Sequence, residues 1–279
     1  MGSHRDAIPR VTPPRGADPD RPNPARIYDY ALGGSANFAA DRAAFAAFAA
    51  FYPDNALAAR SNRAFLRRSV AYLARQGIDQ FLDVGSGLPT VGNVHEVVRG
   101  INPHARVVYV DNDPVAVRYS RQLLAEEQVA GVTAIEADLR DPAAILGHPR
   151  ARALLDLARP VGLLLVAVLH FIPDDDEARR AVRELTAAVP LGSYLTIAHG
   201  TLEGASEGYA QLVRLYEDTA RPLCFRPRAE VESFFAGVEL VEPGLVYASA
   251  WRPQPDDTDD PLRDEPGRAP NWTGVGRKL

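Results

Sequence analysis

Three acidic residues in the middle of the chain stand where strands of a parallel sheet would end. Asp83 lies within the apolar run FLDV, Asp111 ends the run VVYVD, and Asp138 follows VTAIEA. Open α/β sheets bind their ligands beyond the carboxyl ends of the strands. Because ionised carboxylates only accept hydrogen bonds, this edge is expected to bind donor or cationic groups of a ligand.

A glycine-rich turn, Gly85-Ser86-Gly87, directly follows the first of these runs. Its glycines let the backbone turn tightly and approach a ligand closely, and the next helix offers unpaired N–H groups. A dinucleotide fingerprint would have a third glycine in place of Thr90 and needs no acid within the strand. Asp83 supplies a negative charge that a pyrophosphate site would avoid, so it argues for a different ligand. The alternative is a structural turn whose loop is capped by Asp83.

The second acid, Asp111, stands at the end of the next expected strand. A carboxylate in this position can accept hydrogen bonds from both hydroxyls of a ribose. Asp113 and Asp141 each precede a proline, which favours helix-capping roles for both. Asp111 is therefore the first ligand-binding residue that we expect.

The elements around these residues alternate between short β-rich runs and helical runs, which is typical of a parallel α/β sheet. Strands are expected at 81–84, 107–110, 132–136, 162–169 and 194–198, separated by helices at 90–99, 114–128, 143–157 and 174–189. A final hairpin would pair 238–241 with 245–250. The predicted fold is a Rossmann-like, doubly wound α/β domain with a seven-stranded, mostly parallel sheet whose last strand is antiparallel.

The chain is expected to divide into a core domain with attached segments. Residues 1–24 are rich in proline and lack apolar periodicity, which indicates a disordered arm. Residues 25–78 are expected to form a cap of two or three helices, and residues 79–251 the core domain. Within it, residues 200–225 stand where a lid would be. Residues 252–279 are expected to be a mobile tail, with Trp272 and Val275 as anchors.

The fourth expected strand ends in Leu169-His170, which should face the reactive end of a ligand. His170 could act as a general base, donate a hydrogen bond to a substrate, or only order its loop. The acidic residues 174–176 that follow are favoured as charges at a helix N-terminus rather than as metal ligands, so no metal site is expected.

The run FLDVGSG resembles the apolar-apolar-Asp/Glu-x-Gly-x-Gly motif of class I S-adenosylmethionine-dependent methyltransferases. The chain is more specifically similar to a group of bacterial S-adenosyl methyltransferases with mostly unassigned acceptors. This likeness rests on the N-terminal motif NPARIYDYALGG and on the later runs RSNR, GLPT, NVHE and GVGRK.

The resemblance implies S-adenosylmethionine as cofactor, bound at the carboxyl edge of the sheet. Asp138 would meet the exocyclic amine of adenine, and Leu139 would offer a backbone N–H. Arg63 could pair with the methionine carboxylate, although Arg63 and Tyr28 could equally tie the cap to the core domain. The expected cofactor-binding residues are Tyr28, Arg63, Asp83, Gly85, Ser86, Gly87, Asp111, Asn112, Asp138, Leu139 and Leu169, with His170 as the catalytic candidate.

Composition limits the partners. The net charge of −5 offers no broad positive field for nucleic acid, so a small-molecule acceptor is expected. A single cysteine, Cys224, allows no intramolecular disulfide, and no apolar run is long enough to span a membrane, so a cytoplasmic location is expected. Two alternatives stay open, a non-catalytic protein that binds the same cofactor and, less favoured, an NAD-dependent oxidoreductase.

Overall fold

The computed structural model describes residues 18–89, 92–205, 207–210, 223–254 and 259–279. Most of the expected arm and part of the expected lid lie outside these ranges. The elements are α1 (Pro24–Ala31), α2 (Ala39–Phe51), α3 (Asn55–Arg75), β1 (Gln80–Val84), α4 (Val94–Arg99), β2 (Arg106–Asp111), α5 (Pro114–Glu126), β3 (Val132–Glu136), α6 (Pro142–Gly147), α7 (Pro149–Leu154), β4 (Gly162–Val166), η1 (Leu169–Phe171), α8 (Asp175–Ala187), β5 (Tyr194–Gly200), α10 (Arg228–Ser233), β6 (Glu239–Leu240), β7 (Val246–Tyr247), η2 (Ala248–Ala250), η3 (Pro266–Arg268) and β8 (Asn271–Arg277).

One mixed sheet organises the chain, with the strand order β3-β2-β1-β4-β5-β8-β6 and with β7 also paired to β8. The strands β1 to β5 all run parallel to one another. β8 runs antiparallel to β5, and both β6 and β7 run antiparallel to β8. The predicted fold class, an open and mostly parallel α/β sheet with antiparallel C-terminal strands, is confirmed.

The expected C-terminal hairpin is wrong in its pairing. The short strands β6 and β7 pair with β8 rather than with each other. β8 comes from the tail that was expected to be a mobile loop, and it lies between β5 and β6. Its sequence, NWTGVGR, contains two glycines, which are depleted in strands, so composition favoured a loop there.

Alternation along the strands separates two hydrophobic cores. Leu82 and Val84 of β1 lie in one core with residues of α6, α7 and α8. Phe81 of the same strand lies in the other core with α3 and with Trp251. Successive side chains of a strand point to opposite faces, so β1 is buried on both sides, as expected for a central strand of a parallel sheet.

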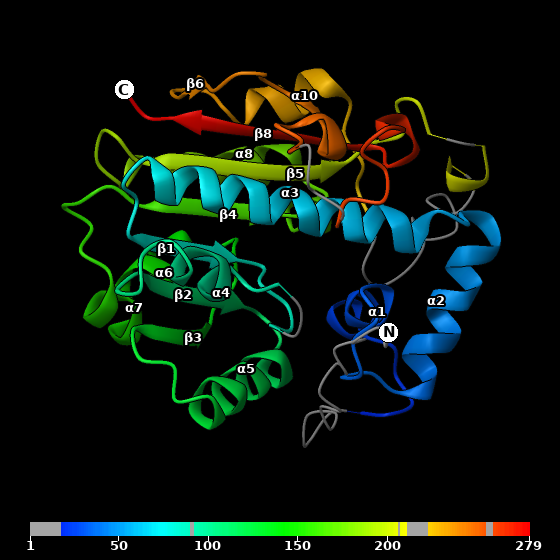
Figure 1. Cartoon of the computed structure of the whole chain (residues 1–279), viewed down its shortest axis with the longest axis horizontal. Helices are drawn as coiled ribbons and strands as arrows, with labels where there is room; N and C mark the ends of the chain where they lie inside the picture. The colour runs from blue at the N-terminus through cyan, green and yellow to red at the C-terminus, as the bar shows by residue number, and fades with distance from the viewer. Residues whose placement is uncertain (1–17, 90–91, 206, 211–222, 255–258) are drawn as a thin grey trace, which may run out of the picture.

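The N-terminal helices cover one face and one end of the sheet (Figure 1). Helix α3 runs along the face over β4 and β5, while α1 and α2 lie on the side toward which the parallel strands point. Across the described ranges, no helix combines the length and apolar character needed to cross a membrane. The cap thus lies beside the carboxyl edge, where the sequence placed its candidate residues.

The predicted helix-capping roles are confirmed. Asp113 accepts a hydrogen bond from the Val115 amide at 2.8 Å, and Asp141 accepts one from the Ala144 amide at 3.0 Å. Asp174 caps α8 by accepting a hydrogen bond from the Glu177 amide at 2.8 Å, and the first turn of α8 is acidic. These carboxylates satisfy N–H groups that have no partner within their helices.

A buried ion pair anchors the tail to α3. The Arg68 Nη1 atom lies 3.0 Å from the Asp260 carboxylate, and the two side chains are 6% and 0% exposed. Arg68 also donates to the backbone oxygens of Trp251 and Ala248, while Ser249 donates to Asp260. These contacts hold the start of the tail against the cap before β8 enters the sheet.

We expect Asp260→Ala to lower the free energy of unfolding by about 3 to 5 kcal/mol, because it leaves the Arg68 guanidinium buried without its counter-charge. Denaturant unfolding followed by circular dichroism measures this change. Asp259→Ala is the matched control, since Asp259 pairs with Arg67 but is 65% exposed, and it should cost about 1 kcal/mol or less. Equal effects of the two substitutions would contradict the anchoring role.

Candidate functional site

The glycine-rich turn after β1 has the geometry that its sequence predicts. Gly85 and Gly87 have φ angles of +78° and +63°, a region that favours glycine. A Cβ atom on Gly85 would lie 2.3 Å from the Val168 side chain. The Gly85 and Ser86 amides both donate to the Val110 carbonyl, which joins the turn to β2. Thr90 lies outside the described residues.

Asp111 lies at the end of β2, directly beside this turn. One carboxylate oxygen accepts a hydrogen bond from the Gly87 amide at 2.8 Å, and the other accepts one from the Asp113 amide at 2.9 Å. Burial raises the pKa of the Asp111 carboxyl, and these amide hydrogen bonds oppose the shift. Each oxygen keeps a second lone pair, so the carboxylate can still accept hydrogen bonds from a ligand.

Helix α1 lies over the turn and is tied to the same strand end. Its N-cap residue, Asn23, donates from Nδ2 to Asp113 at 2.6 Å. A Cβ atom on Gly87 would lie 3.6 Å from the Cβ of Ala25. The cap therefore lies directly against the expected cofactor site. The sequence motif that contains Asn23 did not predict this contact.

Much of the N-terminal motif is structural. Asp29 is buried, and its carboxylate accepts a hydrogen bond from Asn37 at 3.0 Å. A Cβ atom on Gly34 would lie 2.1 Å from the Asp29 Oδ1 atom, so only glycine fits there. Tyr30 packs against Phe45 and is 37% exposed. These residues pack and hydrogen-bond with one another at the C-terminal end of α1, which indicates a structural role.

Tyr28, Arg63 and Asp83 form a second polar group at the end of β1. The Tyr28 hydroxyl donates to the Ala59 carbonyl at 3.1 Å and accepts from Asn62 at 2.9 Å. The Arg63 guanidinium lies over the Tyr28 ring, 5.4 Å from its centroid. Burial raises the pKa of Asp83 from 3.8 to about 7, opposed by the positive charge of Arg63. The Tyr28 side chain thus joins α1 to α3 within the cap, and these contacts do not tie the cap to the core domain.

Asp138, after β3, is already paired. Arg140 donates to its two oxygens at 2.9 and 2.6 Å, and Asn112 donates at 3.3 Å. The Arg140 hydrogen bonds hold the pKa of Asp138 at about 2. Leu139 beside it is buried. An adenine amine at this position would therefore share the carboxylate with Arg140.

His170 lies in η1, directly after β4, among aromatic rings. The ring centroids of Phe171, Phe225 and His199 are 4.5, 5.8 and 5.8 Å away. Its Nδ1 atom is buried and has no hydrogen-bond partner among the described residues. Burial, together with the neighbouring His199 and Arg226, lowers the pKa of His170 to about 3. The imidazole is thus neutral at physiological pH. The adjacent Leu169 side chain is fully buried in the core.

A residue that the sequence did not single out, Arg226, fixes the loop that carries His170. Its side chain is buried, and it donates to the Leu169 and Ile172 carbonyls at 3.2 and 2.8 Å. It also donates to Asp175 at 2.8 Å and lies 3.0 Å from the His199 Nε2 atom. Since His199 Nδ1 lies 2.7 Å from the Gly200 carbonyl, the pair indicates an Nδ1-protonated, neutral His199.

The cap also meets the expected lid. Tyr209 packs against Tyr52 of the cap, with centroids 4.7 Å apart, and against Phe225 at 5.5 Å. A Cβ atom on Gly208 would lie 2.2 Å from the Phe51 carbonyl oxygen. Tyr216, which belongs to the expected lid, lies outside the described residues. A row of rings therefore leads from His170 to α2.

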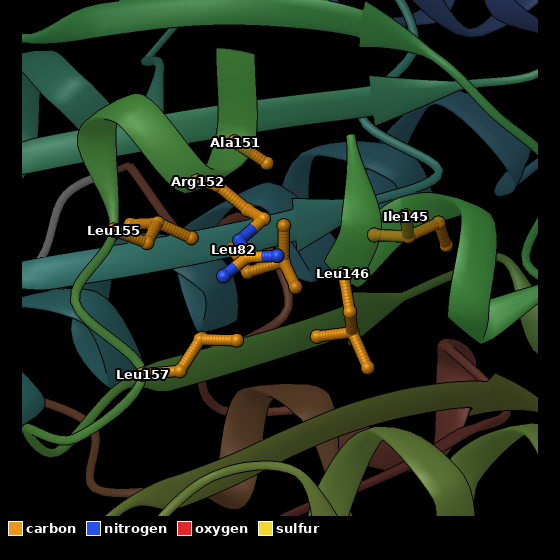
Figure 2. A pocket seen from close by; sticks show the side chains of 7 residues that line it. All are labelled: Leu82, Ile145, Leu146, Ala151, Arg152, Leu155 and Leu157. Carbon is orange, nitrogen blue, oxygen red and sulfur yellow. The ribbon is translucent and has the colours of Figure 1, made fainter. Parts of the chain in front are cut away.

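A small cavity lies inside the core rather than at this edge (Figure 2). It has a volume of about 10 Å³, the space of roughly one water molecule. The residues around it are Leu82, Ile145, Leu146, Ala151, Arg152, Leu155 and Leu157. Most are apolar and come from β1, α6, α7 and the segment after α7. The cavity is too small and too apolar to be the cofactor site.

The sheet order, the turn after β1 and the acids at successive strand ends define the class I methyltransferase fold. Within this class, the chain belongs to the S-adenosyl methyltransferase family, whose sequence model matches residues 10–279. No curated protein matches the sequence.

Two solved structures resemble the whole chain. A candidate methyltransferase from Thermobifida fusca YX is 41% identical, with a TM-score of 0.86, over 96% of this chain and 99% of that one. A DUF574 family protein from Streptomyces avermitilis MA-4680 is 42% identical, with a TM-score of 0.87, over 94% of this chain and 99% of that one. Both likenesses include the N-terminal cap, because they extend over nearly the full length of each chain.

The raised pKa of Asp83 predicts that replacing its carboxyl group stabilises the protein by an amount that depends on pH. The folded protein holds this proton to a higher pH than the unfolded chain, so the contribution of Asp83 to stability falls as the pH rises from about 4 to about 7. Asp83→Asn should therefore raise the melting temperature, and the gain should grow across this interval and then level off. Thermal melts of both proteins at a series of pH values measure it.

Asp138→Asn is the control for this experiment. The Asp138 carboxyl has its pKa held at about 2, so it is ionised in both states above about pH 5. Its substitution should change the melting temperature by the same amount from about pH 5 to about pH 8. A gain for Asp83→Asn that is also constant over this range would show that the Asp83 carboxyl is not held protonated by burial.

Proposed function

We propose that this protein is a methyltransferase that uses S-adenosylmethionine and acts on a small-molecule acceptor. The observation that carries the proposal is the Asp111 carboxylate, held by the Gly87 amide at the end of β2. An acid so placed beside a glycine-rich turn suits the hydroxyls of a ribose. Family membership supports the choice of cofactor.

The residues around the turn fit the rest of that cofactor. Asp138 and Asn112 lie beyond Asp111 on the β3 side, where an adenine amine could donate to the carboxylate. The buried acid Asp83 lies on the other side, at β1, next to the cationic Arg63. When bound, the cofactor supplies an activated methyl group, and the chain contributes orientation and exclusion of water.

The surroundings of the site support a small acceptor. The cap lies over the turn at Ala25, and α2 meets the segment after β5 through Tyr52 and Tyr209. Aromatic rings line the way from α2 to His170. The net charge is −5. An approach lined by aromatic rings suits a small organic molecule, whereas nucleic acid needs an open basic groove.

Calorimetry tests the cofactor assignment. S-adenosylmethionine and S-adenosylhomocysteine should each bind, and NAD should not. Asp111→Ala should weaken binding of both by about 1.5 to 3 kcal/mol, because hydrogen bonds to a charged group are lost. Asp79→Ala is the control, since Asp79 precedes β1 at the opposite edge and pairs with Arg159. Binding of NAD alone, or an Asp111→Ala variant with unchanged affinity, would overturn the assignment.

His170 is proposed to contact the acceptor as a neutral hydrogen-bonding group. An imidazole with a pKa near 3 takes up a proton poorly at neutral pH, so it is a weak general base. Once an acceptor is identified from a panel of phenols and amines with labelled cofactor, His170→Asn should lower kcat/KM by about tenfold or less. A loss of about 10²-fold or more, with a rate-determining pKa that disappears in the variant, would establish a general base instead.

A further inference from the structure

Two neighbouring residues of α3 each hold one buried polar atom that has no hydrogen-bond partner within the described part of the chain. These atoms are Oδ1 of Asn62 and Nε of Arg63. A buried group left without a partner costs on the order of 1 to 3 kcal/mol, so two such groups in adjacent positions require an explanation.

The orientation of the Asn62 amide is fixed by its surroundings. Its Nδ2 atom donates to the Tyr28 hydroxyl at 2.9 Å, and that hydroxyl donates to the Ala59 carbonyl at 3.1 Å. The unpartnered atom is therefore the carbonyl oxygen, which can only accept. The Arg63 guanidinium lies over the ring of the same Tyr28. The side chains that carry the two unpartnered atoms thus both contact Tyr28 of α1.

The two atoms need partners of opposite kind. Arg63 is a cationic donor and needs an anionic acceptor, whereas Asn62 Oδ1 needs a donor. Asp83, a buried acid at the end of β1, lies close enough for its charge to interact with that of Arg63. An α-amino acid carries the matching pair, a carboxylate and an ammonium group.

The sheet order places this group at one end of the proposed cofactor site. The strands run β3, β2, β1, with Asp138 after the first, Asp111 at the end of the second and Asp83 on the third. If Asp138 and Asp111 meet the base and the ribose, the amino-acid end of the cofactor falls at the end of β1, where the charge of Arg63 acts on Asp83.

We propose that α3 recognises the amino-acid end of the cofactor, with Arg63 binding the α-carboxylate and Asn62 Oδ1, together with Asp83, binding the α-ammonium. This inference rests on the proposed function. The cap then has a direct role in binding: it selects a nucleoside that carries an amino acid over one that does not.

Calorimetry with three probes tests the inference. Decarboxylated S-adenosylmethionine lacks only the carboxylate, and 5′-methylthioadenosine lacks the whole amino-acid end. The wild-type protein should bind S-adenosylmethionine at least about tenfold more tightly than the decarboxylated form. Arg63→Met should abolish this preference, and Arg63→Lys should keep part of it. Asn62→Ala should weaken binding of both by about tenfold.

All variants should bind 5′-methylthioadenosine within about twofold of the wild-type affinity, which also shows that they are folded. Arg60→Met, an exposed arginine on the same helix, should leave every affinity unchanged. A wild-type protein that binds none of the probes would contradict the proposed function itself. A wild-type protein that binds S-adenosylmethionine and its decarboxylated form equally would overturn the assignment of Arg63 even if the variants fail to fold. Asn62→Ala with unchanged affinities would overturn that of Asn62.

Discussion

The carboxylate of Asp111 joins three separate parts of the chain at the carboxyl edge of the sheet. One oxygen accepts from the Gly87 amide after β1, and the other accepts from the Asp113 amide before α5. Asp113 in turn accepts from Asn23, which caps α1. The glycine-rich turn, the following helix and the N-terminal cap are therefore linked through two acids, Asp111 and Asp113. Because Asp111 is also the proposed ribose ligand, the cofactor site and the cap's attachment at Asp113 lie two residues apart.

The central part of the fold could be predicted from the sequence because its buried strands are continuous apolar runs. Runs such as FLDV and VVYV are buried on both faces of a parallel sheet, and aspartates before proline begin helices at Asp113 and Asp141. The pairing of β8 with β5, β6 and β7 could not be predicted in this way. Gly276 of β8 is required because a Cβ atom there would lie 2.4 Å from Val238, a contact made only in the assembled sheet. Strand propensity does not report such packing.

The residues of the candidate site likewise fall into two groups, those that local sequence predicts and those that depend on distant contacts. The strand-end acids follow from local pattern and from the rule for open sheets. Arg226 and Asn23 do not, because their partners are far away in the sequence: Arg226 bonds to the Leu169 and Ile172 carbonyls, and Asn23 bonds to Asp113. Backbone carbonyls leave no sequence signal at all. The orphaned Asn62 Oδ1 is likewise visible only when its surroundings are known.

The position of β8 has a consequence for how the protein is synthesised. β8 lies between β5 and β6 in space but follows both in the chain. While the ribosome adds the residues between Gly200 and Asn271, β5 has no neighbour on that side and β6 and β7 have no strand to pair with. An unpaired strand edge is a template for association with other chains. The β5 edge therefore stays unpaired until β8 has been synthesised and has added to the sheet.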